Sequence, residues 1–104
     1  MNILISTLKE ELATAKRLEN KYIEKLEALP RGSFIIRIVC NKQYGYLTFR
    51  EDGKVKQEYL GSLSEDEVEY YRNAMTQRAE YKRKLKSVRE QIKIINRALR
   101  GKTK

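Results

Sequence analysis

The stretch GSFIIRIVCNKQYGYLTFREDGKVKQEYLGS (Gly32–Ser62) decides the fold that the sequence predicts. It contains three runs rich in β-branched and aromatic residues, separated by short polar or glycine-containing segments, and this pattern is typical of β-strands. We expect a three-stranded antiparallel meander over residues 33–61, with strands at residues 34–40, 44–50 and 54–60.

The register of the second hairpin depends on the length of the loop around Asp52 and Gly53. A two-residue loop would place Phe49 on one face with Lys56. A three-residue loop, with Gly53 in the left-handed conformation, would instead place Phe49 beside Val55. Because the longer loop gathers apolar residues on one face, we predict the three-residue loop.

This register gives the predicted sheet two different faces. One face is apolar, and we expect helices to cover it: Phe34, Ile36, Ile38, Cys40, Leu47, Phe49, Val55 and Tyr59. The other face is mostly polar and aromatic: Arg37, Tyr44, Tyr46, Thr48, Arg50, Lys54, Lys56 and Glu58, together with Ile35 and Val39. Cys40 is therefore expected to be a small buried hydrophobe.

Long helices are predicted on both sides of the meander. Apolar residues at heptad spacing favour a helix over residues 3–29, which Pro30 ends. A capping box of Ser64 and Glu67 begins a second helix over residues 64–100, and residues 101–104 form a short basic tail. The sequence thus predicts a single α+β domain (residues 1–104), with the sheet inserted into an antiparallel coiled-coil-like helical hairpin.

The two predicted helices differ in length. If Leu29 lies level with Ser64, the last turns of the second helix overhang the first by roughly 15 Å. The overhang would leave Ile92, Ile95 and Leu99 without an intramolecular partner. Exposed apolar stripes of this kind pair with one another, so we predict a homodimer.

The net positive charge lies in the last quarter of the chain. Residues 82–104 carry ten Lys or Arg and one acid, whereas residues 1–81 carry 13 of each sign. Six of these cations recur at intervals of three or four residues and form one helical face, here called the basic stripe: Lys82, Lys86, Arg89, Lys93, Arg97 and Arg100. They are either flanking charges of a coiled coil or ligands for about six phosphates.

A second group of candidate nucleic-acid-binding residues falls on the polar face of the predicted sheet. Its members are Arg37, Tyr46, Arg50, Lys54 and Lys56. Arginine can read guanine edges in the major groove, and tyrosine can stack on unpaired bases. The alternative is an ordinary solvated sheet surface.

The residue content argues against an enzyme. The chain has no histidine and one cysteine, so it has neither a Cys-His nucleophile pair nor a Cys/His zinc site, and we predict no catalytic residue, metal or cofactor. No apolar run approaches the roughly 20 residues that span a bilayer. With no recognisable signal segment, we expect a cytoplasmic protein without a membrane span.

The segments LPRGSF (residues 29–34) and YGYLTFREDGKVKQEYLG (residues 44–61), followed by a long charged helix, resemble a family of small uncharacterised bacterial and archaeal proteins. This resemblance implies a fold but no activity. More distantly, a three-stranded meander followed by a helix is similar to the arm-binding domains of tyrosine integrases, which lay such a sheet in the DNA major groove.

The sequence therefore predicts a non-enzymatic protein that binds DNA or RNA through the basic stripe, with the polar sheet face as a second contact surface. The alternative is a structural scaffold that homodimerises through its long helices. An acidic protein partner would also suit the basic stripe.

Overall fold

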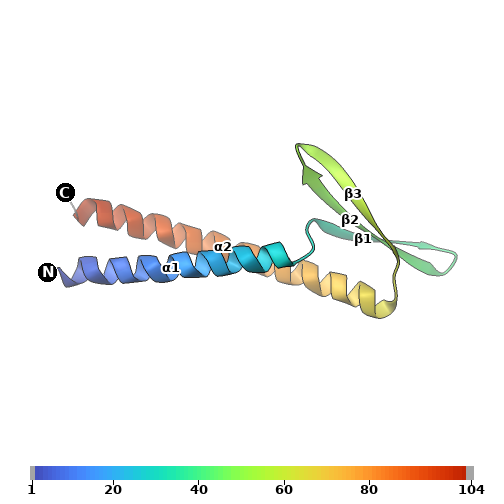
Figure 1. Ribbon diagram of the computed structural model, residues 1–104, viewed down its shortest axis with the longest axis horizontal. Helices are drawn as coiled ribbons and strands as arrows, with labels where there is room; N and C mark the ends of the chain where they lie inside the picture. The colour runs from blue at the N-terminus through green and yellow to red at the C-terminus, as the bar shows by residue number, and fades with distance from the viewer. Residues whose placement is uncertain (1, 103–104) are drawn as a thin grey trace. The chain divides into compact units, whose positions relative to one another are not determined.

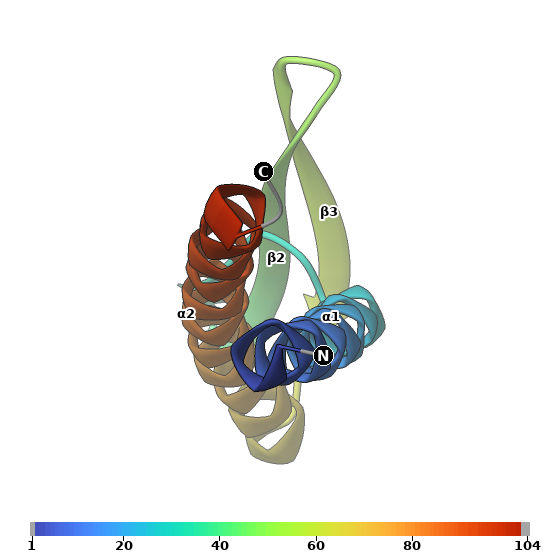
Figure 2. The ribbon, with the colours of Figure 1, turned by 90° about the vertical axis from the view of Figure 1, so that its left-hand side faces the viewer.

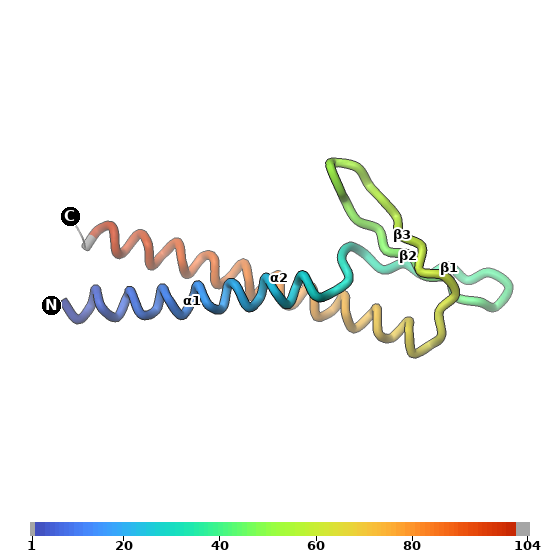
Figure 3. The backbone as a smooth tube through the Cα atoms, viewed as in Figure 1, coloured from blue at the N-terminus to red at the C-terminus, as the bar shows by residue number. Residues whose placement is uncertain are grey.

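The computed structural model describes residues 2–102, which contain two helices and three strands (Figure 1). In chain order these are α1 (Ile3–Ala28), β1 (Ser33–Val39), β2 (Lys42–Glu51), β3 (Lys54–Ser62) and α2 (Glu65–Lys102), and Figure 3 traces the backbone through them. The three strands form one antiparallel sheet, so the predicted α+β class is confirmed. The coiled-coil-like hairpin stays a prediction.

The chain divides into two compact units. Unit 1 comprises Met1–Leu26 and Tyr81–Lys104, and unit 2 comprises Glu27–Glu80. Helix α2 is continuous from Glu65 to Lys102, so its first turns belong to unit 2 and the remainder to unit 1. The two units are described separately below.

Unit 1 contains two helical segments that contact each other through apolar side chains. Its buried residues include Ala15 from α1 and Leu85 and Val88 from α2. The rings of Tyr22 and Tyr81 lie 6.1 Å apart. Figure 2 shows the beginning of α1 and the end of α2 nearest the viewer, so the two segments run in opposite directions.

These contacts differ from the predicted helix register. If Leu29 lay level with Ser64, Ala15 would lie beside a residue of α2 that comes well before Leu85 in the chain. In the structure Ala15 instead packs with Leu85 and Val88. The reason is that the first turns of α2 pack on the sheet of unit 2. With the later turns of α2 beside α1, Ile95 is only 9% exposed and Ile92 packs against the unit 1 core. The prediction that Ile92 and Ile95 lack intramolecular partners is therefore wrong.

Capping side chains define the beginning of both helices. The Asn2 carboxamide oxygen accepts a hydrogen bond of 2.9 Å from the Leu4 backbone N–H. At α2, Ser64 Oγ accepts from the Glu67 backbone N–H at 3.2 Å, and Glu67 Oε1 accepts from the Ser64 backbone N–H at 3.1 Å. The predicted capping box is therefore confirmed.

The sheet has the strand order β1-β2-β3, and its second hairpin has a two-residue loop. Glu51 pairs with Lys54, and the intervening Asp52 and Gly53 have φ values of 53° and 75°. Two consecutive left-handed residues are typical of a type I′ turn, whose twist matches that of the flanking strands. The predicted three-residue loop is wrong.

The shorter loop changes which residues share a face of the sheet. Phe49 pairs with Lys56, whereas Val55 and Tyr59 lie on the opposite face with exposures of 65% and 59%. A register shift near Tyr46 then places an extra residue, Leu60, in β3. The predicted apolar assignments of Val55 and Tyr59, and the polar assignments of Lys54, Lys56 and Glu58, are therefore wrong.

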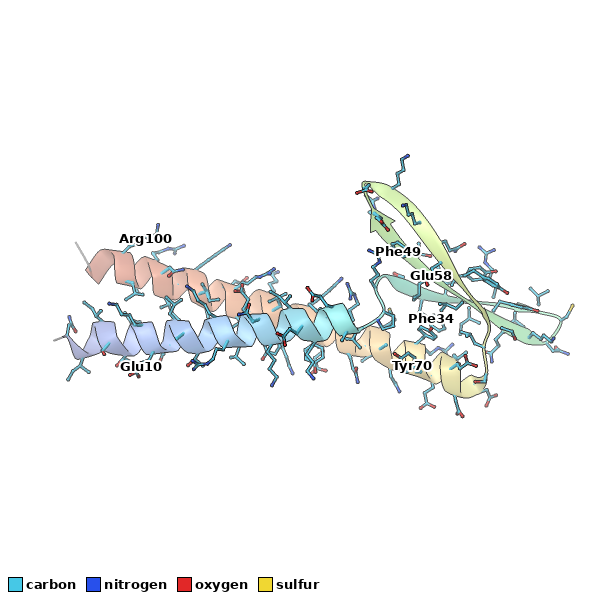
Figure 4. All side chains as sticks on the ribbon, viewed as in Figure 1. Glu10, Phe34, Phe49, Glu58, Tyr70 and Arg100 are labelled. Carbon is cyan, nitrogen blue, oxygen red and sulfur yellow. The ribbon has the colours of Figure 1, made fainter. Side chains whose placement is uncertain are left out.

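One face of the sheet, here called the covered face, packs in part against the first turns of α2, but Ile38 on this face is 72% exposed, so the prediction that helices cover Ile38 is wrong. Phe34 stacks on Tyr71 with ring centroids 5.1 Å apart, and Figure 4 shows Phe34 between the sheet and the helix. Leu63 lies directly against Gly45, where a Cβ atom would collide with the leucine side chain. The opposite face, here called the open face, carries Ile35, Arg37, Val39, Lys42, Tyr44, Tyr46, Thr48, Arg50, Val55, Gln57 and Tyr59.

The first hairpin also differs from its prediction. β1 ends at Val39, which pairs with Lys42, and the exposed Cys40 forms a two-residue turn with Asn41. Both turn residues have positive φ values, 50° and 65°. The tight turn explains why Cys40 is not the buried strand residue that the sequence predicted.

Gly32 and Gly53 provide a test of close packing in unit 2. Both have positive φ, but a Cβ atom at Gly32 would collide with the Thr48 carbonyl, whereas a Cβ atom at Gly53 meets nothing within 4 Å. We expect Gly53→Ala to cost about 1 kcal/mol and Gly32→Ala roughly 3 kcal/mol in the free energy of unfolding. Urea denaturation followed by tyrosine fluorescence measures both, and equal losses would contradict the described packing.

The position of Cys40 predicts its reactivity in the folded protein. Because its side chain is exposed at a turn, an aromatic disulfide reagent should modify it at nearly the rate of the urea-unfolded chain. A Val39→Cys, Cys40→Ala variant, with the thiol one residue earlier on the open face, serves as a control for local access. Modification of Cys40 only after unfolding would support the original buried assignment instead.

Candidate nucleic-acid interface

The basic stripe lies on α2 within unit 1, and all six of its side chains are exposed. At 3.6 residues per turn, its members fall within an arc of about 80° and extend over roughly 27 Å. The apolar residues that contact α1, such as Leu85 and Val88, occupy a neighbouring arc of the same helix. Packing against α1 therefore leaves the stripe facing solvent within unit 1.

The surface along the stripe is hollowed in two adjacent places. One hollow is lined by Lys82, Leu85, Lys86, Arg89, Glu90 and Lys93, and the other by Lys93, Asn96, Arg97, Leu99 and Arg100. Lys93 borders both hollows, so cations line a shallow surface that continues to Arg100, which is labelled near the end of α2 in Figure 4.

One stripe residue forms an ion pair with α1. Arg89 Nε donates to Glu19 Oε2 at 3.1 Å, and both side chains are partly exposed. An ion pair between the helices is what the interpretation as flanking charges expects of Arg89, whereas the coiled coil itself stays a prediction. Among residues 2–102, the five other stripe cations form no ion pair: Lys82, Lys86, Lys93, Arg97 and Arg100.

The two units differ strongly in formal charge. Unit 1 has fifteen Lys or Arg and five acids in its sequence, a formal charge of +10. Unit 2 has eight Lys or Arg and nine acids, a formal charge of −1. A long-range attraction for polyanions therefore belongs to unit 1, and it weakens as salt screens it.

The open face of unit 2 gathers aromatic side chains. The Tyr59 ring lies 5.3 Å from that of Tyr46 and 6.4 Å from that of Tyr44. The guanidinium of Arg37 lies over the Tyr46 ring at 5.3 Å, which is a cation–π distance. We call these four residues, Arg37, Tyr44, Tyr46 and Tyr59, the tyrosine platform.

The structure separates the sheet residues that the sequence grouped together. Arg37, Tyr46 and Arg50 share the open face, as predicted. Lys54 and Lys56 belong to the other face, where Lys56 Nζ lies 3.9 Å from Glu51 Oε1. The sequence reasoning missed Tyr59, although an Asp-Gly pair between two strands is a strong signal for the two-residue turn that places it here.

Neither a metal centre nor a membrane span is found in the part of the chain that the structure describes. Within residues 2–102, no three His, Cys, Asp or Glu side chains are grouped so that they could hold a metal ion. Over the same residues, neither helix combines the length and apolar character needed to cross a bilayer.

Comparison with known proteins gives a family but no activity. A family model described as "Domain of unknown function (DUF6788)" matches residues 5–70. No curated protein and no solved structure matches the chain. The match supports the predicted resemblance to an uncharacterised family, whereas the motif and the likeness to integrase arm-binding domains stay predictions. The matched residues contain the open face, and the basic stripe follows them.

Proposed function

We propose that this chain, which belongs to the family described as Domain of unknown function (DUF6788), is a cytoplasmic, non-enzymatic protein that binds nucleic acid through the basic stripe. The observation that carries the proposal is the excess charge of +10 in unit 1. Five of the six stripe cations have no acidic partner among residues 2–102, so they are available to an external polyanion.

The chemistry of the stripe suits phosphate groups. Lysine presents a compact charge on a flexible stem, and arginine presents a planar group that can bind two phosphate oxygens at once. Contacts of this kind position a protein on a nucleic-acid backbone and carry no sequence information. Binding through the stripe is therefore indifferent to base sequence.

Salt dependence gives the proposal a quantitative form. A protein that neutralises five phosphates, one for each unpaired stripe cation, has a log-log slope of affinity against salt of about −4.5 on duplex DNA and about −3.5 on a single strand. An acidic protein partner would not release condensed counterions in this number, so the slope separates it from nucleic acid.

The stripe can be tested by charge reversal with a matched control. In the stripe variant Lys86, Lys93 and Arg97 are replaced by Glu. In the control variant Lys9, Lys16 and Lys21, which are exposed residues of α1, are replaced by Glu, so both variants have the same formal charge. Fluorescence anisotropy of labelled single-stranded DNA, duplex DNA and RNA at several salt concentrations should show that the stripe variant loses about 3 units of slope.

The control variant should keep most of the slope, and circular dichroism should show unchanged helicity in both. If the parent protein binds none of the three nucleic acids at low salt, the proposed function is wrong. Equal losses in both variants would show that net charge matters and that the stripe has no special role.

An apolar hollow of unit 1, with the exposed Ile94 at its edge, favours a second candidate function, a scaffold that homodimerises through its helices. Ala15, Leu18, Ile94 and Ile95 contribute to one hollow between α1 and α2, and Ile94 is 62% exposed. Ala15 and Ile95 are already buried within unit 1, so a second copy would bury mainly Ile94, as apolar side chains are buried in oligomer interfaces.

Sedimentation equilibrium tests this second candidate. We expect the parent to dimerise at micromolar concentration and Ile94→Lys to remain monomeric, because a charge in the interface would be buried without a partner. Asn20→Lys, an equally charged change at an exposed α1 residue outside the hollow, should leave the dimer intact. A parent that stays monomeric would contradict the scaffold.

A further inference from the structure

The arrangement of Tyr59 on the open face is set by the strand pairing. Tyr59 pairs with Tyr46 across β2 and β3, and the register shift next to this pair brings Tyr44 within 6.4 Å. Tyr44 and Tyr46 are half-buried, whereas Tyr59 is 59% exposed. Tyr44 and Tyr46 therefore hold the ring of Tyr59 in place, while much of the surface of that ring remains accessible.

The charges around these rings have a single sign. The charged side chains of the open face are Arg37, Lys42 and Arg50, and all three are exposed. The strand acids Glu51 and Glu58 belong to the covered face. Although unit 2 is nearly neutral, its open face is thus cationic and aromatic.

From this combination we infer that the tyrosine platform binds unpaired nucleobases, so that the ligand is single-stranded nucleic acid. The inference rests on the proposed function and specifies its substrate class. Every base has a π-face that can stack on tyrosine or on a guanidinium plane, and such stacking tolerates any sequence. The surrounding cations suit the phosphates of the same strand.

The corrected strand register argues against a duplex at this face. A sheet that enters the major groove reads base edges with long polar side chains. Lys54 and Lys56, which the sequence assigned to such a reader, lie on the covered face instead. Val55, Gln57 and Tyr59 of β3 lie on the open face in their place, so one aromatic ring joins Tyr44 and Tyr46 there. In a duplex the base faces that such rings contact are hidden by stacking.

A second copy of the chain is a less suitable occupant. The open face has exposed apolar residues, including Ile35 and Val55, that a dimer could bury. However, a symmetric pairing of two open faces would bring together two cationic surfaces with no acid on either. Charge complementarity therefore favours a polyanion.

The chain offers a close control for a platform variant. Tyr59→Leu removes the exposed ring and keeps an apolar side chain. Tyr70→Leu makes the same change on α2, where Tyr70 is 58% exposed, almost the same as Tyr59. Tyr59→Phe keeps the ring and should keep the affinity. Circular dichroism and urea denaturation establish that each variant is folded.

Binding is measured with oligothymidylate, with its duplex with oligoadenylate, and with inorganic polyphosphate. Because the chain has no tryptophan, base stacking can be followed directly by quenching of tyrosine emission. We expect the parent to bind the single strand more tightly than the duplex. Tyr59→Leu should lose about tenfold in affinity for the single strand alone, whereas Tyr70→Leu should match the parent.

The outcomes separate the inference from the proposed function. If the Lys86, Lys93 and Arg97 reversals abolish binding but Tyr59→Leu matches the parent on oligothymidylate, the platform inference is overturned and the proposed function remains. If the parent binds none of the three polyanions, both fail. If Tyr59→Leu dissociates a dimer without changing the affinity for oligothymidylate, the platform is an interface between copies.

Discussion

The two-residue turn at Asp52 and Gly53 is the constraint on which the arrangement of unit 2 depends. Its two left-handed residues match the twist of the strands, and side chains alternate along a strand, so this one turn decides which face every residue of β3 joins. The turn leaves Val55 in solvent. Phe49 is protected by another route, because the Arg31 guanidinium lies 4.0 Å above its ring and forms a 2.9 Å ion pair with Glu51.

Helix α2 serves two different packing partners along one continuous length. Its first turns carry Tyr71, which stacks on Phe34 of the sheet, and its later turns carry Leu85 and Val88, which pack with Ala15. The apolar residues of α2 therefore pack against the sheet in its first turns and against α1 in its later turns. Five of the six cations of the basic stripe form no ion pair among residues 2–102. Because packing of α2 does not use these cations, the basic stripe is a candidate for external contacts.

The sequence predicted those features that short-range chemistry controls. The α+β class followed from hydrophobic periodicity, and the capping box of Ser64 and Glu67 followed from one local motif. Strand pairing and helix register depend on distant contacts. The three-residue turn was predicted because it would place Val55 beside Phe49 and so protect the Phe49 ring from solvent. In the structure Arg31, which is distant in the sequence, covers that ring instead. The basic stripe was visible in the sequence, whereas Tyr59 joined the platform only through pairing with Tyr46.

The extra residue in β3, Leu60, lies between Tyr59 on the open face and the end of the strand that leads to α2. Leu60 lies at the register shift, and beyond it the chain delivers Leu63 to Gly45 on the covered face and Ser64 to the beginning of α2. A deletion of Leu60 would remove the bulge and leave Tyr59 and Gly61 as neighbours opposite Tyr46 and Gly45, so both residues would keep their faces while the local bend of β3 is lost. The bend of β3 beside Tyr59 and the length of chain that reaches Leu63 therefore both depend on this one position, so a change in chain length there acts on the tyrosine platform and on the beginning of α2 together.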